Sequence, residues 1–311
     1  MANQLSVSSL TPAGAGRFAP SPTSDLHLGN LRTGLLSWLM ARATGRAHLV
    51  RIEDLDAARV AAAEGVVARQ LADLAAIGVE ADGLVVRQSE RLGLYEDALA
   101  HLPTYECFCT RAEIREASSA PHGDGYRPYP GTCRDLTEAQ RAERRARRPP
   151  ALRVRAGDVT ETVRDVWAGE VSRVVDDFVV RRNDGAFAYN LAVVVDDVAQ
   201  GVDQVVRGDD LLSSAPRQAW LTRRLGGRSP VYAHVPLVLG PDGRRLAKRD
   251  GAVTLADLTA SGLTAGGVLA LIGASLGLCA PGERVTAHTL LARFDPDAVP
   301  RSPWGWTPPA S

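Results

Sequence analysis

The sequence predicts an α/β fold: a Rossmann-like parallel sheet that is split by an insertion and followed by a short helical C-terminal region. Residues 17–53 have the pattern of a strand, a tight loop with a glycine, a helix and a second strand, which is a βαβ unit. The continuous apolar run at residues 191–195 suits a strand buried on both faces of a parallel sheet. Between them, from about residue 96 to about residue 187, cysteines, prolines, arginines and short strand patterns indicate an insertion.

The first unit is expected to contain a helix at residues 31–44, which Gly45 ends. Residues 46–53 follow as a buried strand, residues 64–77 as a second helix, and residues 85–88 as a short strand. The first helix has apolar side chains at helical spacing: Leu35, Leu36, Leu39 and Met40.

The later part of the chain predicts a helix at residues 216–225 and a strand at residues 235–239, which precedes a turn at residues 240–243. Residues 255–278 are expected to be helical. The chain contains neither of the two common glycine-rich nucleotide motifs, GxGxxG and GxxxxGK followed by Ser or Thr.

Four regions follow from these patterns. Residues 12–95 are expected to form the first half of the Rossmann-like domain and residues 188–250 the second half. Residues 96–187 are the inserted region between the two halves, and residues 251–311 are the short helical end.

The composition is that of a globular protein, with 45% hydrophobic residues in 311. Lys plus Arg and Asp plus Glu both number 36, so bulk charge does not indicate a nucleic-acid partner. Residues 141–148 hold five arginines and one glutamate, which is either a local basic face for such a partner or a solvated helix face. No apolar run has the length of a membrane span and no signal peptide is recognised, so we expect a cytoplasmic monomer.

The four cysteines do not have the spacing of a disulfide framework. Cys107, Cys109 and Cys133 lie within 27 residues and predict a metal site, whereas Cys279 stands alone in an apolar segment and is expected in the core. A closed tetrahedral zinc site needs a fourth ligand. The neighbouring candidates are His122, Asp124, Tyr126 and Tyr129, and the alternative is three unliganded thiols.

Two segments predict phosphate chemistry. His27-Leu28-Gly29-Asn30 lies at the start of the first helix, where free N–H groups and the helix dipole favour an anion. Residues 243–249 contain Lys248 on a loop after a predicted strand, and a lysine aimed at phosphates stabilises charge that develops during nucleotidyl transfer. Each alone is also typical of an ordinary turn or a solvated loop.

Together these segments resemble the HIGH and KMSKS signatures of class I aminoacyl-tRNA synthetases. The surrounding motifs resemble those of glutamyl-tRNA synthetases, in the same order and over about residues 17–251: Arg17-Phe-Ala-Pro-Ser-Pro-Thr, Arg51-Ile-Glu-Asp-Leu-Asp56, Tyr189-Asn-Leu-Ala-Val-Val-Val-Asp-Asp197, Val206-Arg-Gly-Asp-Asp-Leu211 and His234-Val-Pro-Leu-Val-Leu-Gly-Pro-Asp-Gly243. The KMSKS-like loop departs from the signature at Leu246 and Ala247 but keeps its second lysine, Lys248.

The resemblance implies a glutamate pocket. Glutamate carries two carboxylates and one ammonium, and a buried pocket must balance these charges. Glu53 is expected to bind the ammonium, Arg17 with Tyr189 the side-chain carboxylate, and Arg207 the other carboxylate. Ala19 and Ser21 are implied as further glutamate contacts.

The resemblance also implies ATP as a substrate, with Mg²⁺ on its phosphates. A glutamate carboxylate attacks the α-phosphorus and pyrophosphate leaves, so no side-chain nucleophile is required. His27 and Lys248 are expected to be the catalytic residues. The residues implied in ATP binding are His27, Gly29, Asn30, Leu246 and Lys248.

The metal site and the chain length resemble those of the glutamyl-Q tRNA(Asp) synthetases, truncated relatives of glutamyl-tRNA synthetase. Tyr129-Pro-Gly-Thr-Cys133 resembles the Y-x-x-x-C of that family, which implies one structural Zn²⁺ held by Cys107, Cys109, Tyr129 and Cys133, with His122 as the next candidate. About 60 residues follow Lys248, so no anticodon-binding domain is expected.

The implied function is tRNA-independent activation of glutamate, followed by its transfer to the queuosine base of tRNA(Asp). Two alternatives remain from the sequence: a truncated glutamyl-tRNA synthetase that charges the 3′ end of tRNA(Glu), and a catalytically dead tRNA-binding module.

Overall fold

The computed structural model describes residues 14–56, 60, 65–117, 128–246 and 253–307. Its centre is a seven-stranded sheet in the order β3-β2-β1-β9-β10-β6-β7. All neighbouring pairs are parallel except β6 and β7, which form an antiparallel hairpin at one edge. The strands are β1 (Ala15–Phe18), β2 (Ala47–Ile52), β3 (Val86–Arg87), β6 (Val159–Asp165), β7 (Gly169–Val175), β9 (Val202–Gly208) and β10 (Val231–Val235). The mostly parallel sheet confirms the predicted α/β class.

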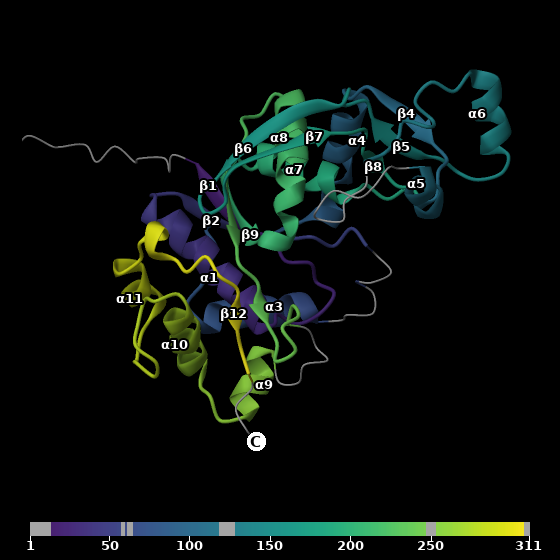
Figure 1. Ribbon diagram of the computed structural model, residues 1–311. Helices are drawn as coiled ribbons and strands as arrows, with labels where there is room; N and C mark the ends of the chain where they lie inside the picture. The colour runs from purple at the N-terminus through teal and green to yellow at the C-terminus, as the bar shows by residue number, and fades with distance from the viewer. Residues whose placement is uncertain (1–13, 57–59, 61–64, 118–127, 247–252, 308–311) are drawn as a thin grey trace, which may run out of the picture.

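Helices cover both faces of this sheet (Figure 1). Successive residues of a strand point to opposite faces. Accordingly, Val206 packs in the core around α1, whereas Val205 packs with Ala215 and Ala219 of α8. The helices are α1 (Leu28–Ala43), α3 (Val66–Ala76), α4 (Leu92–Ala100), α5 (Arg111–Ala117), α6 (Glu138–Arg145), α7 (Tyr189–Ala199), α8 (Ala215–Arg224), α9 (Leu255–Ala260), α10 (Ala265–Ser275) and α11 (Ala287–Ala292).

Helix α1 is buried around most of its circumference because it lies between the sheet and the C-terminal helices. Gly16 of β1 permits the close approach, since a Cβ there would lie 3.1 Å from the Cβ of Ala41. On the other side, the buried Arg32 donates to the carbonyl of Pro236 at 2.9 Å and to the hydroxyl of Ser275 at 3.3 Å. This side chain therefore joins α1 to α10.

The C-terminal part also contains a strand, β12 (Trp304–Gly305), which pairs in parallel with β11 (Val238–Leu239). The strand expected at residues 235–239 is in fact two strands in different sheets, with Pro236 between them. The helix expected at residues 255–278 is likewise two, α9 and α10, and Gly262 with a φ of +98° lies between them.

The region between α4 and α7 contains a smaller antiparallel sheet of β4 (Thr104–Cys107), β5 (Ala151–Val154) and β8 (Val179–Arg181). Helix α6 lies at the far end of this region, at the right of Figure 1. The hairpin β6–β7 belongs to the same stretch of sequence but continues the central sheet beside β10.

The prediction of a strand at residues 191–195 is wrong, because this run is the middle of helix α7. A short apolar run without periodicity fits a helix buried on all sides as well as a strand. Here Leu191 to Asp197 are all buried, against α4, α8 and the sheet.

No helix in the described part of the chain is long and apolar enough to cross a membrane.

The buried carboxylate of Asp196 on α7 is expected to be critical for stability. It accepts hydrogen bonds from Gln88 at 2.9 Å, Arg91 at 2.6 Å and Tyr95 at 2.8 Å. Asp196→Ala leaves these donors unpaired, and removing one partner of a buried ion pair costs about 3–5 kcal/mol. Urea unfolding should detect this loss. The exposed Asp97→Ala on α4 is the control, for which about 0.5 kcal/mol or less is expected; equal effects would contradict the assignment.

Candidate functional site

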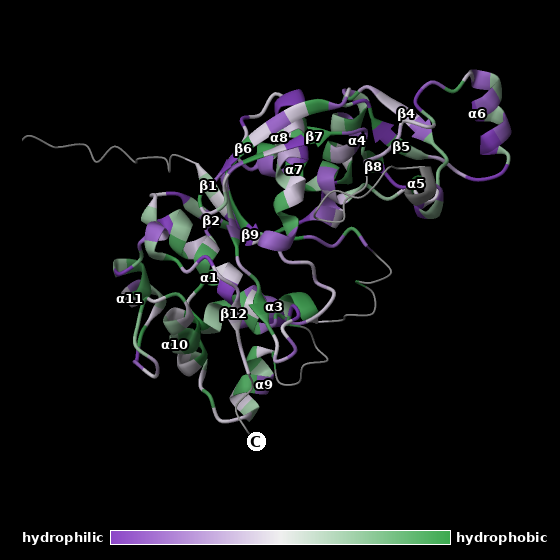
Figure 2. Cartoon of the chain, viewed as in Figure 1, coloured by the Kyte–Doolittle hydropathy of each residue, from purple (hydrophilic) through white to green (hydrophobic). Residues whose placement is uncertain are grey.

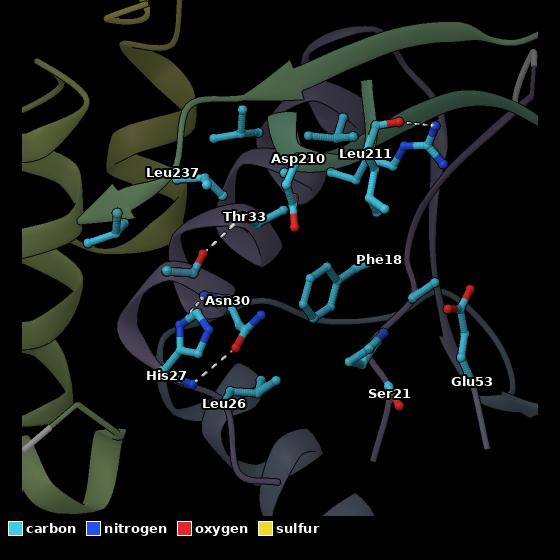
Figure 3. A pocket seen from close by; sticks show the side chains of 18 of the residues that line it. Phe18, Ser21, Leu26, His27, Asn30, Thr33, Glu53, Asp210, Leu211 and Leu237 are labelled. Carbon is cyan, nitrogen blue, oxygen red and sulfur yellow. Dashed lines mark hydrogen bonds between the residues drawn. The ribbon is translucent and has the colours of Figure 1, made fainter. Parts of the chain in front are cut away.

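A cavity of about 470 Å³ opens at the carboxyl ends of β1, β9 and β10. The strand order is β3-β2-β1-β9-β10, so successive strands are added to one side of β1 in the first half of the chain and to the other side in the second half. The position between β1 and β9 is therefore the topological switch point, which is where open α/β sheets bind ligands. Nine of the predicted site residues line the cavity: Arg17, Ala19, Ser21, His27, Gly29, Asn30, Glu53, Tyr189 and Arg207. In Figure 3, Ser21 and Glu53 lie at one end, His27 and Asn30 at the other, and the Phe18 ring between them.

One predicted ATP-binding residue of the described part, Leu246, does not line this cavity. Leu246 is buried in the core, and its N–H donates to the carbonyl of Val238 at 2.9 Å. Lys248 lies outside the described residues, so its predicted role stays a prediction. From the same loop, Arg245 does line the cavity, where it forms an ion pair with Asp210.

His27 caps the start of α1 within the cavity. Its ring Nδ1 accepts the backbone N–H of Asn30 at 3.3 Å, while the backbone N–H of His27 donates to Oδ1 of Asn30 at 3.2 Å. Burial, reinforced by the charge of Arg245, lowers the pKa of His27 to about 4. The ring is therefore neutral at pH 7, and because Nδ1 is an acceptor, the proton resides on Nε2 and remains available as a donor.

Gly29 has a steric role that the sequence did not indicate. A Cβ at this position would lie 3.0 Å from Cε1 and 3.1 Å from Nδ1 of His27. These separations are shorter than ordinary van der Waals contacts, so a side chain here would displace the imidazole from its capping position. The glycine thus permits the geometry of the helix start.

The loop from β1 to α1 is held by a residue that sequence analysis missed. Gln70 of α3 is buried and donates through Nε2 to the carbonyls of Ser21 at 3.1 Å and Ser24 at 2.7 Å. A polar residue within the buried face of a predicted helix was the available signal.

Arg17 is bound to a carboxylate from α7. Its Nε and Nη2 donate to the two oxygens of Asp197 at 3.3 and 3.4 Å, and Arg51 of β2 contacts the same carboxylate at 2.8 Å. Burial alone would raise the pKa of Asp197, but the two guanidinium groups outweigh it and hold that pKa below its usual range. Arg51 and Asp197 were within recognised motifs but were not predicted as site residues.

Glu53 follows β2 and is less completely compensated. Its carboxylate lies 3.7 Å from Arg51, and its side chain is 14% exposed, toward the cavity. Burial raises the pKa of Glu53, although the charges of Arg51 and Arg17 oppose that rise. Within the described part of the chain, this carboxylate therefore lacks a full counter-charge.

Arg207 of β9 is the complementary cation. In the described part of the chain its hydrogen-bond partners are all neutral: Nε2 of His234 at 3.0 Å, Oε1 of Gln218 at 2.6 Å, the hydroxyl of Tyr189 at 3.5 Å and the carbonyl of Leu211 at 3.3 Å. Arg207 is 5% exposed. A buried guanidinium without a direct carboxylate partner is suited to bind an anionic ligand.

A second site lies at the predicted metal cluster, where the sulfur atoms of Cys107, Cys109 and Cys133 are within 4.8 Å of one another. The hydroxyl oxygen of Tyr129 lies 3.5 Å from the sulfur of Cys107 and 3.8 Å from that of Cys109. In a tetrahedral zinc site with Zn–S of about 2.3 Å, ligand atoms are about 3.8 Å apart. The four side chains thus fit a metal ion, while His122, Asp124 and Tyr126 lie outside the described residues.

The cysteine cluster is linked to helix α8 through Asp176. This carboxylate accepts the N–H of Tyr129 at 2.7 Å and pairs with Arg217 of α8 at 2.9 Å. The guanidinium of Arg153 lies over the Tyr129 ring, 3.7 Å from its centroid. Cys279 lies beyond α10, where its thiol donates to the carbonyl of Ala270; it is partly buried at the edge of the core and not within it as expected.

The arginine run at residues 141–148 lies on and just after α6, which is strongly polar in Figure 2. Arg145 pairs with Glu106 at 2.7 Å and Glu138 at 2.6 Å, and Arg148 pairs with Glu113 at 3.1 Å. These ion pairs favour the interpretation of a solvated helix face over that of a basic binding face.

Comparison with known proteins now defines the class. Residues 15–270 match the family model of class I tRNA synthetases for E and Q, catalytic domain, and the chain is a class I synthetase of this family. It belongs to the glutamyl-Q tRNA(Asp) synthetases within it. It is 59% identical to such a protein from Nocardia farcinica over 96% of this chain and 94% of the relative. It is 60% identical to one from Cutibacterium acnes over 85% of this chain and 76% of the relative.

Among solved structures, the chain resembles a glutamate tRNA ligase from Elizabethkingia meningosepticum that was crystallised with its amino acid. The TM-score is 0.77 at 26% identity, and the match covers 94% of this chain and 66% of that one. The likeness confirms the class I synthetase fold.

Glu53→Gln should not lower the thermal stability at pH 7. Because the pKa of Glu53 is raised in the folded state, the folded protein binds the Glu53 proton more tightly than the unfolded chain does. The stability that this protonation contributes is fully present below the unfolded pKa and is lost as the pH rises through the folded pKa. Glutamine mimics the protonated form at every pH. The melting temperature of the variant should therefore equal or exceed that of the wild type at pH 7, with convergence near pH 4.

The control for this experiment is Glu90→Gln, at an exposed position. Its melting temperature should follow that of the wild type at both pH values. A fall of several degrees for Glu53→Gln alone at pH 7 would contradict the buried, under-compensated state of Glu53.

Proposed function

We propose that this protein activates glutamate with ATP to glutamyl-adenylate without tRNA, and then transfers glutamate to the queuosine base of tRNA(Asp). The observation that carries the proposal is the cavity itself. Besides the Arg245–Asp210 ion pair, one space holds the guanidinium groups of Arg17 and Arg207, the carboxylate of Glu53 and the capped start of α1.

The charges in the cavity match those of glutamate. Arg17 and Arg207 provide two cations for its two carboxylates, and Glu53 provides an anion for its ammonium. Planar guanidinium groups pair with carboxylates through two hydrogen bonds, which disfavours the amide of glutamine. Among the described residues, Glu53 lacks a full counter-charge and Arg207 has only neutral partners. A bound glutamate supplies both missing charges, because its ammonium pairs with Glu53 and a carboxylate pairs with Arg207.

We assign Tyr189 to the same carboxylate as Arg207. The sequence suggested Tyr189 beside Arg17, but its hydroxyl lies 3.5 Å from Nη1 of Arg207. Arg17, which is held by Asp197, is assigned to the other carboxylate, and the loop residues Ala19 and Ser21 border the glutamate end.

The helix start is assigned to ATP. His27 offers a neutral Nε2–H, and Gly29 and Asn30 lie at the dipole end of α1, which favours phosphate. When glutamate attacks the α-phosphorus, these donors and Lys248 stabilise charge that develops on the phosphates. Bound Mg²⁺ would neutralise further phosphate charge. Catalysis then consists of positioning and electrostatic stabilisation.

The cysteine cluster is assigned to one structural Zn²⁺ held by Cys107, Cys109, Tyr129 and Cys133. The donor separations fit a closed tetrahedral site, and the N–H of Cys133 donates to the Tyr129 oxygen at 2.8 Å, which directs that oxygen toward the sulfur atoms.

The acceptor follows from the relatives of this chain. Proteins that are 59% and 60% identical to it are named glutamyl-Q tRNA(Asp) synthetase, whereas the solved glutamate tRNA ligase is 26% identical.

Two assays test the proposed reaction. Glutamate should support exchange of pyrophosphate into ATP without any tRNA, and radiolabelled glutamate should then be transferred to queuosine-containing tRNA(Asp) but not to queuosine-free tRNA(Asp) or tRNA(Glu). Exchange that required tRNA, or equal charging of tRNA(Glu), would favour a truncated glutamyl-tRNA synthetase. No exchange at all would favour an inactive binding module.

Tyr129→Phe should weaken metal retention because it removes one donor from the cluster. Loss of outer-shell partners alone costs about 10–100-fold in metal affinity, so a lost ligand should cost at least about tenfold. Zinc per chain after dialysis against a chelator is the measurement. Tyr105→Phe is the matched control, since its hydroxyl donates to Asp177 at 2.6 Å instead. Equal zinc retention in both variants would remove Tyr129 from the ligand set.

A further inference from the structure

A hydrogen-bonded chain leads from Arg207 away from the cavity to a buried carboxylate. Nε–H of Arg207 donates to Nε2 of His234 at 3.0 Å, and Nδ1 of His234 lies 2.6 Å from Oδ2 of Asp165. The three residues come from β9, β10 and the end of β6, which are adjacent strands of the central sheet. All three are buried.

The chain fixes the tautomer of His234. A carboxylate accepts at Nδ1 and a guanidinium donates at Nε2, so Nδ1 must carry the proton and Nε2 must be unprotonated. Asp165 is held as the ionised acceptor, because it also accepts the N–H groups of His234 at 3.0 Å, Trp167 at 2.9 Å and Ala168 at 2.8 Å. The imidazole therefore presents a lone pair to Arg207.

This arrangement also explains how Arg207 remains buried with no direct carboxylate partner among the residues that the structure describes. The negative charge of Asp165 reaches it through a neutral ring rather than by direct contact. A direct protein carboxylate would compete with the ligand, whereas the ring occupies only Nε–H. Nη1 donates to Gln218 and Tyr189 and Nη2 donates to the carbonyl of Leu211, and of these partners Tyr189 and Leu211 line the cavity.

We propose that His234, oriented by Asp165, is a positioning residue that fixes the guanidinium plane of Arg207 for binding a glutamate carboxylate. The proposal rests on the proposed function and deepens it. His234 does not line the cavity, so it acts through Arg207 and not on the substrate.

The surroundings of His234 keep the ring neutral. Burial lowers its pKa, and the charges of Arg207 on β9 and Arg17 on β1 lower it further, against the opposing effect of Asp165. Tyr232, two residues earlier on β10, stacks on the ring with centroids 5.9 Å apart. An imidazolium would lose the lone pair that receives Arg207.

Two substitutions separate positioning from simple packing. In His234→Asn, the amide can still donate to Asp165 in place of Nδ1 but is too short to reach Arg207. In His234→Gln, the longer side chain can place its oxygen near the former Nε2 and accept from Arg207. The backbone N–H of His234 continues to bind Asp165 in both.

The measurements are pyrophosphate exchange and the melting temperature. His234→Asn should raise KM for glutamate by about tenfold or more, which corresponds to about 1.4 kcal/mol, with KM for ATP within about twofold of the wild type. His234→Gln should recover most of the affinity. Asp165→Asn should act in the same direction as His234→Asn, because an amide at this position would favour the opposite tautomer.

Several outcomes would overturn the inference. An unchanged KM for glutamate in His234→Asn would do so. A KM for glutamate in His234→Gln that is as high as that in His234→Asn, at equal melting temperatures of the two variants, would also do so. Equal increases in both KM values would indicate general damage. If the wild type binds glutamate in a thermal-shift assay but catalyses no exchange, the proposed function fails, and the same comparison of glutamate-induced shifts still decides the role of His234.

Discussion

The structure depends on the balance of buried charge between the strands β1 and β2 and helix α7. Asp197 of α7 lies between Arg17 and Arg51, and Asp196, the next residue, contacts Arg51 and Arg91. Burying any one of these groups alone would be costly, so the strands and α7 are held together by mutual compensation. The same balance leaves Glu53 and Arg207 incompletely compensated at the cavity wall. The candidate pocket is thus the part of the charge network that the described residues do not complete.

Much of this could be predicted because the relevant residues follow local rules. His27 and Asn30 form a capping box at the start of α1, and the βαβ pattern around them is set by short-range sequence. The charges of Arg17, Glu53 and Arg207 could be matched to one substrate from residue type and resemblance. The cysteine spacing likewise predicted the cluster that the structure brings together.

What the sequence could not indicate depends on which residues meet across the sheet. The apolar run at 191–195 has no periodicity, since α7 is buried on all sides, and its length fits a strand equally well. Asp165 and His234 are 69 positions apart and meet because β6 pairs with β10. No local pattern predicts that β6, which lies in the stretch expected to be inserted, extends the central sheet.

Helix α8 connects the two sites that the sequence treated separately. Its consecutive residues Arg217 and Gln218 point to different partners: Arg217 pairs with Asp176, which binds the backbone of Tyr129, and Gln218 accepts from Arg207. The Gln218 amide in turn donates to Asn190 at the start of α7, the helix that carries Asp197. One turn of α8 therefore contacts both the support of the metal cluster and the cation of the pocket.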